Sequence, residues 1–414
     1  MKKILQPIEE ASEKLSTIIN KTPLQYSKRL SDKYKANIYI KREDLQETRS
    51  FKIRGAYNKM STLTDVEKKR GIVCASAGNH AQGVALSCSL LKIKGTIFMP
   101  IITPNQKIEK VRQFGGEYIK IRLIGKTYDE AYAASNTYCV KNKAIYVHPF
   151  NDPLVITGQG TIAQEIYEET NGKIDTVLIP IGGGGLISGM SPYLKAKNPT
   201  IEILGCEPLG AAAMSESLKL GKVVKLSKID PFVDGAAVMQ ASSLTYKICK
   251  DYVDNITIVP EGKICTTMID LYQNEGIIAE PAGALSLAAL DLLAERIKGK
   301  NVICVLSGGN NDISRYPEIV ERSLVYLELK HYFTVEFVQK PGQLRDFLNK
   351  ALGPNDDIVL FEYMKKMNKE KGPALVGIEL KDKKDLAPLM RRMDELEFNY
   401  QKIENEHMLY SLLI

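Results

Sequence analysis

The sequence contains neither a long apolar run nor a block of charges of one sign. Nowhere among its 414 residues do 18 consecutive apolar residues occur, so no membrane-spanning helix is predicted. The 56 basic and 49 acidic residues give a formal charge of +7, but the lysines are spread along the whole chain, which argues against nucleic acid as a partner. The first residues reach Pro7 and Glu9 before an apolar segment develops, so we expect no signal peptide and a cytoplasmic location.

The seven cysteines and four histidines form no metal-binding pattern. No CxxC pair occurs, and the nearest cysteines, Cys74 and Cys88, are 14 positions apart, which indicates reduced and mostly buried thiols. His80 has no second histidine at ligand spacing, so we expect a structural residue and no metal site. With 44% hydrophobic residues and no low-complexity tract, most of the chain should fold, into two or three domains.

Short β-rich apolar runs alternate with helical patterns between residues 70 and 310. Such alternation is typical of βαβ units and predicts an α/β fold with parallel, doubly wound sheets. The runs occupy residues 72–76, 96–100, 118–121, 176–181, 201–207 and 302–307. They fall into two clusters, which predict a small lobe over about 54–150 and a large lobe over the remainder of 1–320, with a ligand site between the lobes. The amino-terminal helix and the strand NIYIKRED fit either lobe.

The pattern changes near Tyr326. Residues 326–414 read as strand, helix, strand, strand, helix and strand, a βαββαβ module of about 90 residues, which is long enough for a separate domain. A third compact unit is therefore predicted at the carboxyl end.

Four glycines, Gly182, Gly183, Gly184 and Gly185, follow an apolar strand and precede a helical segment that begins near Leu186. Backbone amides at such a turn converge without side-chain obstruction at a helix amino terminus, which suits a phosphate. A packing turn is the alternative. The dinucleotide spacing GxGxxG fails, and the GKT triplet at 125–127 fails as a P-loop because residue 120 is lysine, so a lone phosphate fits best.

Lys52 stands between Phe51 and Ile53 in the run SFKIRG. An amine in apolar surroundings is more easily neutral, and a neutral amine is what a Schiff base requires. A solvated lysine on a half-buried element is the ordinary alternative. Ser50 does not have the SxxK spacing of Ser-Lys hydrolases.

Three further turns follow or precede predicted elements. Ser76, Gly78 and Asn79 end a strand and open a helix, where backbone amides bind a carboxylate and Asn79 can donate to a phenolate-like oxygen; a helix cap is the alternative. Ser307 ends another strand in the run SGGN, for which a plain turn is the alternative. Glu280 lies in the constrained turn EPAG, as a pocket carboxylate or a loop corner.

The motifs SFKIRGA, SAGNHAQG, GGGGL, EPAGA and SGGN occur in one order over residues 5–320, and together they resemble the threonine dehydratase family. This family belongs to the two-lobed fold-type-II enzymes, tryptophan synthase β-like, that use pyridoxal 5′-phosphate (PLP). The module at 326–414, including PGQL from Pro341, resembles the ACT-like regulatory domain of biosynthetic members, present here once.

The resemblance implies a role for each motif residue. Lys52 would be the catalytic Schiff-base lysine, which also removes the substrate's α-proton, and Asn79 would pair with the PLP hydroxyl. The phosphate would bind Gly182, Gly183, Gly184, Gly185 and Leu186, and the pyridine nitrogen would face Ser307. The substrate carboxylate would be held by Ser76, Gly78 and Asn79, and Glu280 would line the pocket. No metal is expected.

The activity that this resemblance implies is conversion of L-threonine to 2-oxobutanoate and ammonia, and of serine to pyruvate, as the first step of isoleucine biosynthesis. The resemblance also implies that isoleucine inhibits the enzyme, that valine counteracts this inhibition, and that the chain forms a homotetramer.

Three other functions are weighed against this one. Serine racemase shares most motifs, but it has a serine where this chain has Ala77, and alanine has no proton to transfer. One acidic metal ligand of the racemase pattern is replaced by Ala213. A non-enzymatic amino-acid sensor would not need Lys52, and a nicotinamide-dependent dehydrogenase is disfavoured by the failed glycine spacing.

Overall fold

The computed structural model describes residues 2–363, 370–404 and 413, which form parts of two compact units, residues 1–311 and 312–414. Each unit is described by itself. The domain limits expected from the sequence, 1–320 and 326–414, stay predictions, because compactness alone does not show that a segment folds independently.

The small lobe of the first unit is built on a four-stranded parallel sheet in the order β5-β4-β3-β6. Its strands are β3 (Ile72–Ala75), β4 (Gly95–Met99), β5 (Ile119–Leu123) and β6 (Ile145–Tyr146), and its helices are α3 (Lys52–Ser61), α4 (Asp65–Arg70), α5 (Asn79–Leu91), α6 (Asn105–Gly115) and α7 (Tyr128–Asn142). Alternate residues of β3 face opposite ways, so Cys74 packs against α5 while Val73 and Ala75 pack against tyrosines of α7. Helices on both faces explain why β3 and β4 are buried throughout.

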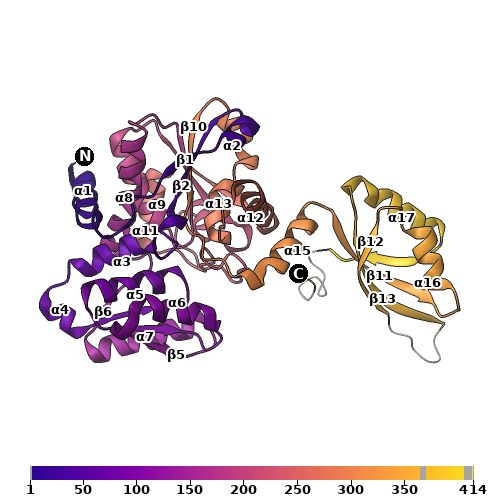
Figure 1. Ribbon diagram of the computed structural model, residues 1–414, viewed down its shortest axis with the longest axis horizontal. Coiled ribbons are helices and arrows are strands. Elements are labelled where there is room, and N and C mark those ends of the chain that lie inside the picture. Colours follow the sequence, from indigo (N-terminus) through magenta and orange to yellow (C-terminus); the bar gives the residue numbers. More distant parts are fainter. Residues whose placement is uncertain (1, 364–369, 405–412, 414) are drawn as a thin grey trace. The chain divides into compact units, whose positions relative to one another are not determined.

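The large lobe is built on a six-stranded sheet in the order β1-β2-β10-β7-β8-β9, parallel except for β1. Figure 1 labels its strands β1, β2 and β10. Its strands are β1 (Leu24–Tyr26), β2 (Asn37–Arg42), β7 (Thr176–Pro180), β8 (Glu202–Pro208), β9 (Asn255–Val259) and β10 (Asn301–Leu306). Its helices are α1 (Lys2–Leu15), α2 (Lys28–Tyr34), α8 (Pro153–Glu169), α9 (Gly185–Lys197), α10 (Ala213–Lys219), α11 (Ser243–Tyr252), α12 (Glu261–Glu275), α13 (Pro281–Ala288) and α14 (Ala294–Ile297). Because β2 pairs with β10, the amino-terminal strand that fitted either lobe belongs to the large one.

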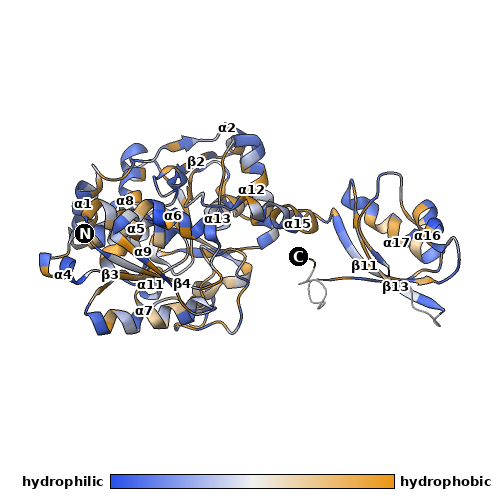
Figure 2. Cartoon of the chain, turned by 60° about the horizontal axis from the view of Figure 1, so that its bottom comes forward, coloured by the Kyte–Doolittle hydropathy of each residue, from blue (hydrophilic) through white to orange (hydrophobic). Residues whose placement is uncertain are grey.

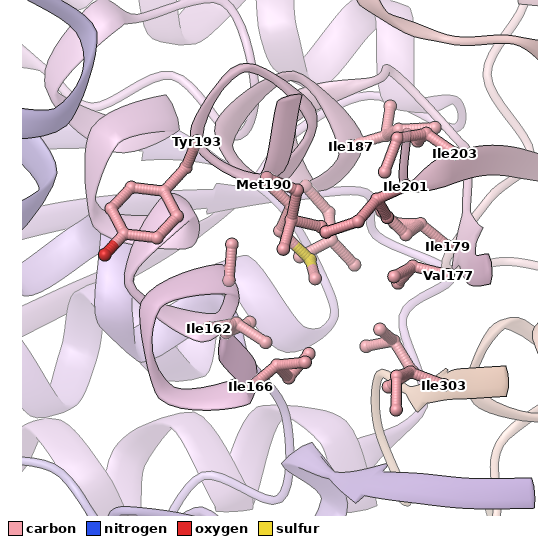
Figure 3. Packing of buried hydrophobic residues seen from close by; sticks show 14 of the residues in the cluster. Ile162, Ile166, Val177, Ile179, Ile187, Met190, Tyr193, Ile201, Ile203 and Ile303 are labelled. Carbon is pink, nitrogen blue, oxygen red and sulfur yellow. The ribbon is translucent and has the colours of Figure 1, made fainter. Parts of the chain in front are cut away.

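The core of the large lobe holds the start of α9 in place. Figure 3 shows Ile187 and Met190 of α9 packed among aliphatic side chains of the sheet and of α8. The labelled neighbours are Ile162, Ile166, Val177, Ile179, Ile201, Ile203 and Ile303. These side chains are almost wholly buried, and each contributes about 1.5–3 kcal/mol on burial. The turn between β7 and α9 is therefore attached to two rigid elements.

The second unit has an antiparallel sheet in the order β12-β13-β11-β14. Its elements are α15 (Tyr316–Tyr326), β11 (Lys330–Val338), α16 (Gln343–Asp346) with a π-helical turn (Phe347–Ala351), β12 (Asp357–Tyr363), β13 (Lys371–Glu379), α17 (Leu386–Glu395) and β14 (Asn399–Lys402). Blue and orange residues alternate along α17 in Figure 2, and its Leu389 and Met393 are buried in the core of this unit. The βαββαβ order predicted from the sequence is confirmed, as is the α/β class of the chain.

Two predicted absences can be compared with the described residues. Among them, no helix has both the length and the apolar character needed to cross a bilayer. All seven cysteines are free, and all but Cys139 are buried, as the sequence predicts.

Candidate functional site

Lys52 is the first residue of α3, at the boundary between the lobes. The backbone before it is tied to the end of β10, because Phe51 N donates to Ser307 O at 3.2 Å and Ser50 forms a bridge with Gly308. Lys52 Nζ donates to the carbonyl oxygen of Pro149 at 3.0 Å. Burial lowers the pKa of Lys52 to about 8, although the negative charge of Glu280 opposes this. The amine therefore loses its proton far more easily than an ordinary lysine.

Two neutral histidines lie near this amine. Burial, together with the charge of Lys52, lowers the pKa of His80 to about 3 and that of His148 to about 4. His148 Nδ1 accepts hydrogen bonds from the backbone N–H groups of Phe150 and Asn151, at 3.2 and 2.8 Å, and so carries no proton. His80 Nε2 lies 2.8 Å from Val147 O, which can only accept, so Nε2 carries the proton. Both rings act as neutral, structural groups, as the sequence predicts for His80.

The four-glycine turn lies between β7 and α9, where the sequence predicts it. Gly184 has a φ of +85°, which a side chain would strain, and Gly185 begins the helix. A Cβ at Gly183 would overlap the Phe150 ring, and one at Gly185 would lie 2.8 Å from Phe150 Cβ. The first N–H groups of α9 have no acceptor within the helix, so they are available to an anion. Leu186 contributes only its backbone, because its side chain is buried in the core.

The segment Pro149–Phe150 joins the lysine to the glycine turn. Pro149 accepts the hydrogen bond of the Lys52 amine, and the next residue, Phe150, packs on Gly183 and Gly185. The reactive amine and the anion-binding turn are thus two ends of one continuous site. Neither Pro149 nor Phe150 was expected from the sequence.

Asn79, the first residue of α5, is held between two groups of the large lobe. Its Nδ2 donates to Glu280 Oε1 at 2.6 Å, and its Oδ1 accepts from Asn310 Nδ2 at 2.8 Å. Asn310 Nδ2 also donates to the carbonyl oxygen of Thr48 at 2.7 Å. Three turns that lie up to 231 positions apart therefore meet at one amide.

Glu280 is a buried carboxylate whose ionisation is unfavourable. Burial, and then the negative charge of Asp234, raise its pKa to about 7. Its Oε1 also lies 2.3 Å from the position that a Cβ on Gly308 would take, and 3.7 Å from the Cβ position of Gly235. Gly235 precedes Ala236, whose Cα would lie 2.9 Å from a Cβ on Gly182. Glu280 thus lies between the Asn79 turn and the four-glycine turn.

Ser76, Gly78 and Ser307 lie at the carboxyl ends of parallel strands, as the sequence predicts. Ser76 Oγ accepts from Gly78 N at 3.2 Å, and no atom lies within 4 Å of the Cβ position of Gly78. Ser307 is buried, and its Oγ is 3.3 Å from Ala282 O. The structure thus brings the predicted site residues together, places Asn310 of the SGGN motif beside Asn79, and adds Pro149 and Phe150.

These residues fit PLP. The partly buried Lys52 amine of lowered pKa would suit its aldehyde. The four-glycine turn at the amino terminus of α9 would suit its phosphate, and the Asn79 amide would suit its ring hydroxyl. No group of histidine, cysteine and acidic residues in the described ranges could hold a metal ion. The Glu207 carboxylate instead accepts from the N–H groups of Met214 and Ser215, at 2.8 and 2.7 Å.

Comparisons with known proteins agree with this geometry. The model of the family "Pyridoxal-phosphate dependent enzyme" matches residues 15–308, and "C-terminal regulatory domain of Threonine dehydratase" matches residues 321–413. The chain is 50% identical to L-threonine dehydratase biosynthetic IlvA of Halalkalibacterium halodurans, over 99% of both chains. It is 51% identical to that of Bacillus subtilis, over 98% of this chain and 96% of the relative.

Solved structures show the same kinship. The processed form of threonine deaminase isoform 2 from Solanum lycopersicum aligns with a TM-score of 0.74 and 40% identity, over 77% of this chain and 92% of that one. Maize serine racemase aligns with a TM-score of 0.72 and 31% identity, over 78% and 98%. The chain belongs to the pyridoxal-phosphate-dependent enzymes, and within them to the biosynthetic threonine dehydratases with a carboxyl-terminal regulatory domain.

Proposed function

We propose that this chain converts L-threonine to 2-oxobutanoate and ammonia, and L-serine to pyruvate, with PLP on Lys52. The observation that carries the proposal is the single site in which the Lys52 amine, the four-glycine turn and the Asn79 amide meet. Full-length similarity to biosynthetic threonine dehydratases supports the choice of substrate and a place in isoleucine biosynthesis.

The chain's own residues bind and orient the reactants. The amides of Gly182–Leu186 would hold the phosphate, Asn79 the ring hydroxyl and Ser307 the ring nitrogen. Ser76, Gly78 and Asn79 would hold the substrate carboxylate, where the space beside Gly78 is open. When bound, PLP supplies an electron sink for the pair left at the substrate's α-carbon.

Proton transfer falls to Lys52. Its pKa of about 8 leaves a useful fraction of neutral amine at neutral pH, and this amine would take the α-proton before the β-hydroxyl leaves. Glu280, with a pKa of about 7, is protonated often enough to influence proton transfers in the pocket. We assign it to the lining of the pocket.

Dehydration is favoured over racemisation. Inverting the α-carbon needs a proton donor on the face opposite Lys52, and Ala77 between Ser76 and Gly78 has none. The likeness to maize serine racemase therefore reflects the shared fold and cofactor rather than the same outcome.

Regulation is assigned to the second unit. A carboxyl-terminal regulatory domain implies an allosteric effector, and we propose isoleucine as the inhibitor, valine as its antagonist and a homotetramer as the assembly. Removing residues 326–414 should abolish the response of activity to isoleucine. If the truncated enzyme stays equally sensitive, the effector site lies elsewhere.

The test of the activity is ketoacid production from threonine and serine by wild type, Lys52→Ala and Lys59→Ala. Lys59 lies on the same helix, and its amine is paired with Asp152 at 3.1 Å. We expect Lys52→Ala to lose at least about 10⁴-fold in kcat, the upper range for removal of a catalytic base, and Lys59→Ala to retain activity.

Borohydride reduction followed by peptide mapping supplies an independent measurement. The reduced cofactor adduct should lie on Lys52. An adduct on another lysine, or no adduct, would sink the proposal, as would undiminished activity of Lys52→Ala.

A further inference from the structure

We propose that Asn310 is a positioning residue that determines which end of the Asn79 amide faces the cofactor. The inference rests on the proposed function, because it takes Asn79 as the partner of the cofactor's ring hydroxyl. Asn310 belongs to the SGGN turn after β10, on the large lobe, whereas Asn79 begins α5 on the small lobe.

The orientation of the Asn310 amide is fixed by partners of unambiguous polarity. Its Nδ2 lies 2.7 Å from the backbone carbonyl oxygen of Thr48, which can only accept a hydrogen bond. Its Oδ1 lies 3.4 Å from the ammonium of Lys110, which can only donate. Thr48 is fully buried, so this carbonyl has little access to water in compensation. The amino end of Asn310 must therefore point toward Thr48 and Asn79.

This polarity is passed on to Asn79. The second hydrogen of Asn310 Nδ2 faces Asn79 Oδ1 at 2.8 Å, so the oxygen end of Asn79 points to Asn310. The amino end of Asn79 then faces Glu280 Oε1 at 2.6 Å, where an ionised carboxylate accepts one of its two hydrogens. One N–H of Asn79 is left for the cofactor.

The remaining N–H decides how the ring oxygen of the cofactor is held. An N–H facing that oxygen forms a charge-assisted hydrogen bond, whereas a reversed Asn79 would present its own oxygen to it and to Glu280. Reversal would replace an attraction with contact between acceptors. Asn310 opposes this reversal through its hydrogen bond to Asn79 Oδ1.

The test is Asn310→Asp, which keeps the shape of the side chain and replaces its only donor end with an acceptor. Lys110 can still donate to one oxygen of the introduced carboxylate, but the oxygen that replaces Nδ2 faces Thr48 O and can accept only from the amino end of Asn79, which must then turn over. We expect the affinity for added PLP to fall roughly 10- to 100-fold, the range for losing a hydrogen bond to a charged group. The visible absorbance of the remaining bound cofactor should fall relative to its near-ultraviolet absorbance, because the ring oxygen has lost its donor.

A double variant separates positioning from damage to the fold. In Asn310→Asp with Glu280→Gln, the glutamine amide can donate to the reversed Asn79, so the hydrogen-bond chain is satisfied in the opposite direction. We expect the urea midpoint of the cofactor-free protein to recover toward that of wild type, while PLP affinity stays weak. If PLP affinity recovers together with stability, Asn310 has only a structural role and the proposal is overturned.

A milder variant covers the case in which Asn310→Asp does not fold. Asn310→Ala removes one of the two contacts that orient the Asn79 amide and leaves only its hydrogen bond to Glu280, and we expect PLP to bind roughly fivefold more weakly with the same change of spectrum. Unchanged affinity and spectrum in either single variant overturn the inference while leaving the proposed function intact. A wild-type protein that binds no PLP would instead overturn the proposed function itself.

Discussion

Two basic residues, Lys52 and Arg54, lie two positions apart at the start of α3. Arg54 is paired with two carboxylates, whereas the Lys52 amine contacts a neutral carbonyl oxygen. Arg54 is completely buried, and its guanidinium makes two hydrogen bonds to Glu43, at 2.7 and 2.8 Å, and two to Glu165, at 2.5 and 3.0 Å. Burial opposes its charge, but these two carboxylates outweigh burial and hold the pKa of Arg54 above its usual value. Lys41, also buried, adds ion pairs to Glu165 and Glu169.

Lys52 has no such compensation. Its amine donates to a neutral carbonyl, and the nearby carboxylate of Glu280 is itself costly to ionise, with a pKa of about 7. The same helix therefore begins with a reactive amine and continues with an anchored guanidinium. The comparison indicates that the ion pairs of Arg54 fix α3 to the large lobe. The Lys52 amine has no such ion pair, so its pKa is low and it can act as a base or nucleophile.

The largest expected effect on stability comes from removing the paired charge of Arg54. Arg54→Met leaves Glu43 and Glu165 buried beside an uncharged side chain, and we expect the free energy of unfolding to fall by about 3–5 kcal/mol in urea denaturation. Arg112→Met is the matched control, because its partner Glu109 and Arg112 itself are both largely exposed, and it should cost less than about 1 kcal/mol. Equal effects of the two substitutions would contradict the anchoring role.

Much of this fold could be predicted from the sequence, because continuous apolar runs bounded by small residues define buried parallel strands. The runs beginning at Thr176 and Val302 correspond to β7 and β10 within one residue, and the turns after them hold the candidate site. The strand β6 has only two half-buried residues and β9 is mostly half-buried, so neither has a distinct pattern. Short strands of this kind form only through their neighbours in the sheet.

The contacts within the site could not be predicted in the same way. Lys52 meets Pro149 across 97 positions, and Asn79 meets Asn310 across 231. No local pattern indicates such pairs, because they depend on how the two lobes meet. Asn310 stood in a motif that the sequence singled out, yet its role follows only from the orientation of Thr48 O. The roles assigned to the motif residues stay predictions until cofactor and substrate binding are measured.

A second prediction concerns Glu280, the carboxylate near Lys52, and tests whether the charges around Lys52 lack the pairing found around Arg54. Its pKa is raised from 4.5 to about 7 by burial and then by Asp234, so the folded protein holds a proton there that the unfolded chain loses between these values. In cofactor-free protein, the contribution of this group is therefore fully present below about pH 4.5 and is lost as pH rises through about 7. We expect Glu280→Gln to exceed wild type by on the order of 3 kcal/mol above pH 7 and by little near pH 4.5. Exposed Glu109→Gln serves as the control in urea titrations, and a difference that does not vary with pH would contradict the prediction.

The smallest expected effect is that of Lys52→Met. It tests the difference between Lys52 and Arg54 directly, because Lys52→Met should raise the free energy of unfolding whereas Arg54→Met should lower it. Burial lowers the pKa of Lys52 from 10.5 to about 8. The charged amine therefore destabilises the folded protein below about pH 8, and this destabilisation disappears as pH rises from 8 toward 10.5. Because the side chain remains partly exposed, we expect cofactor-free Lys52→Met to be more stable than wild type by only about 1–2 kcal/mol at pH 7, with the gain lost above about pH 10. Lys59→Met, which removes a partly buried lysine paired with Asp152, should not be stabilising. Destabilisation of Lys52→Met at pH 7 would mean that this amine is compensated as fully as Arg54, and the distinction between a reactive and an anchored charge on α3 would be lost.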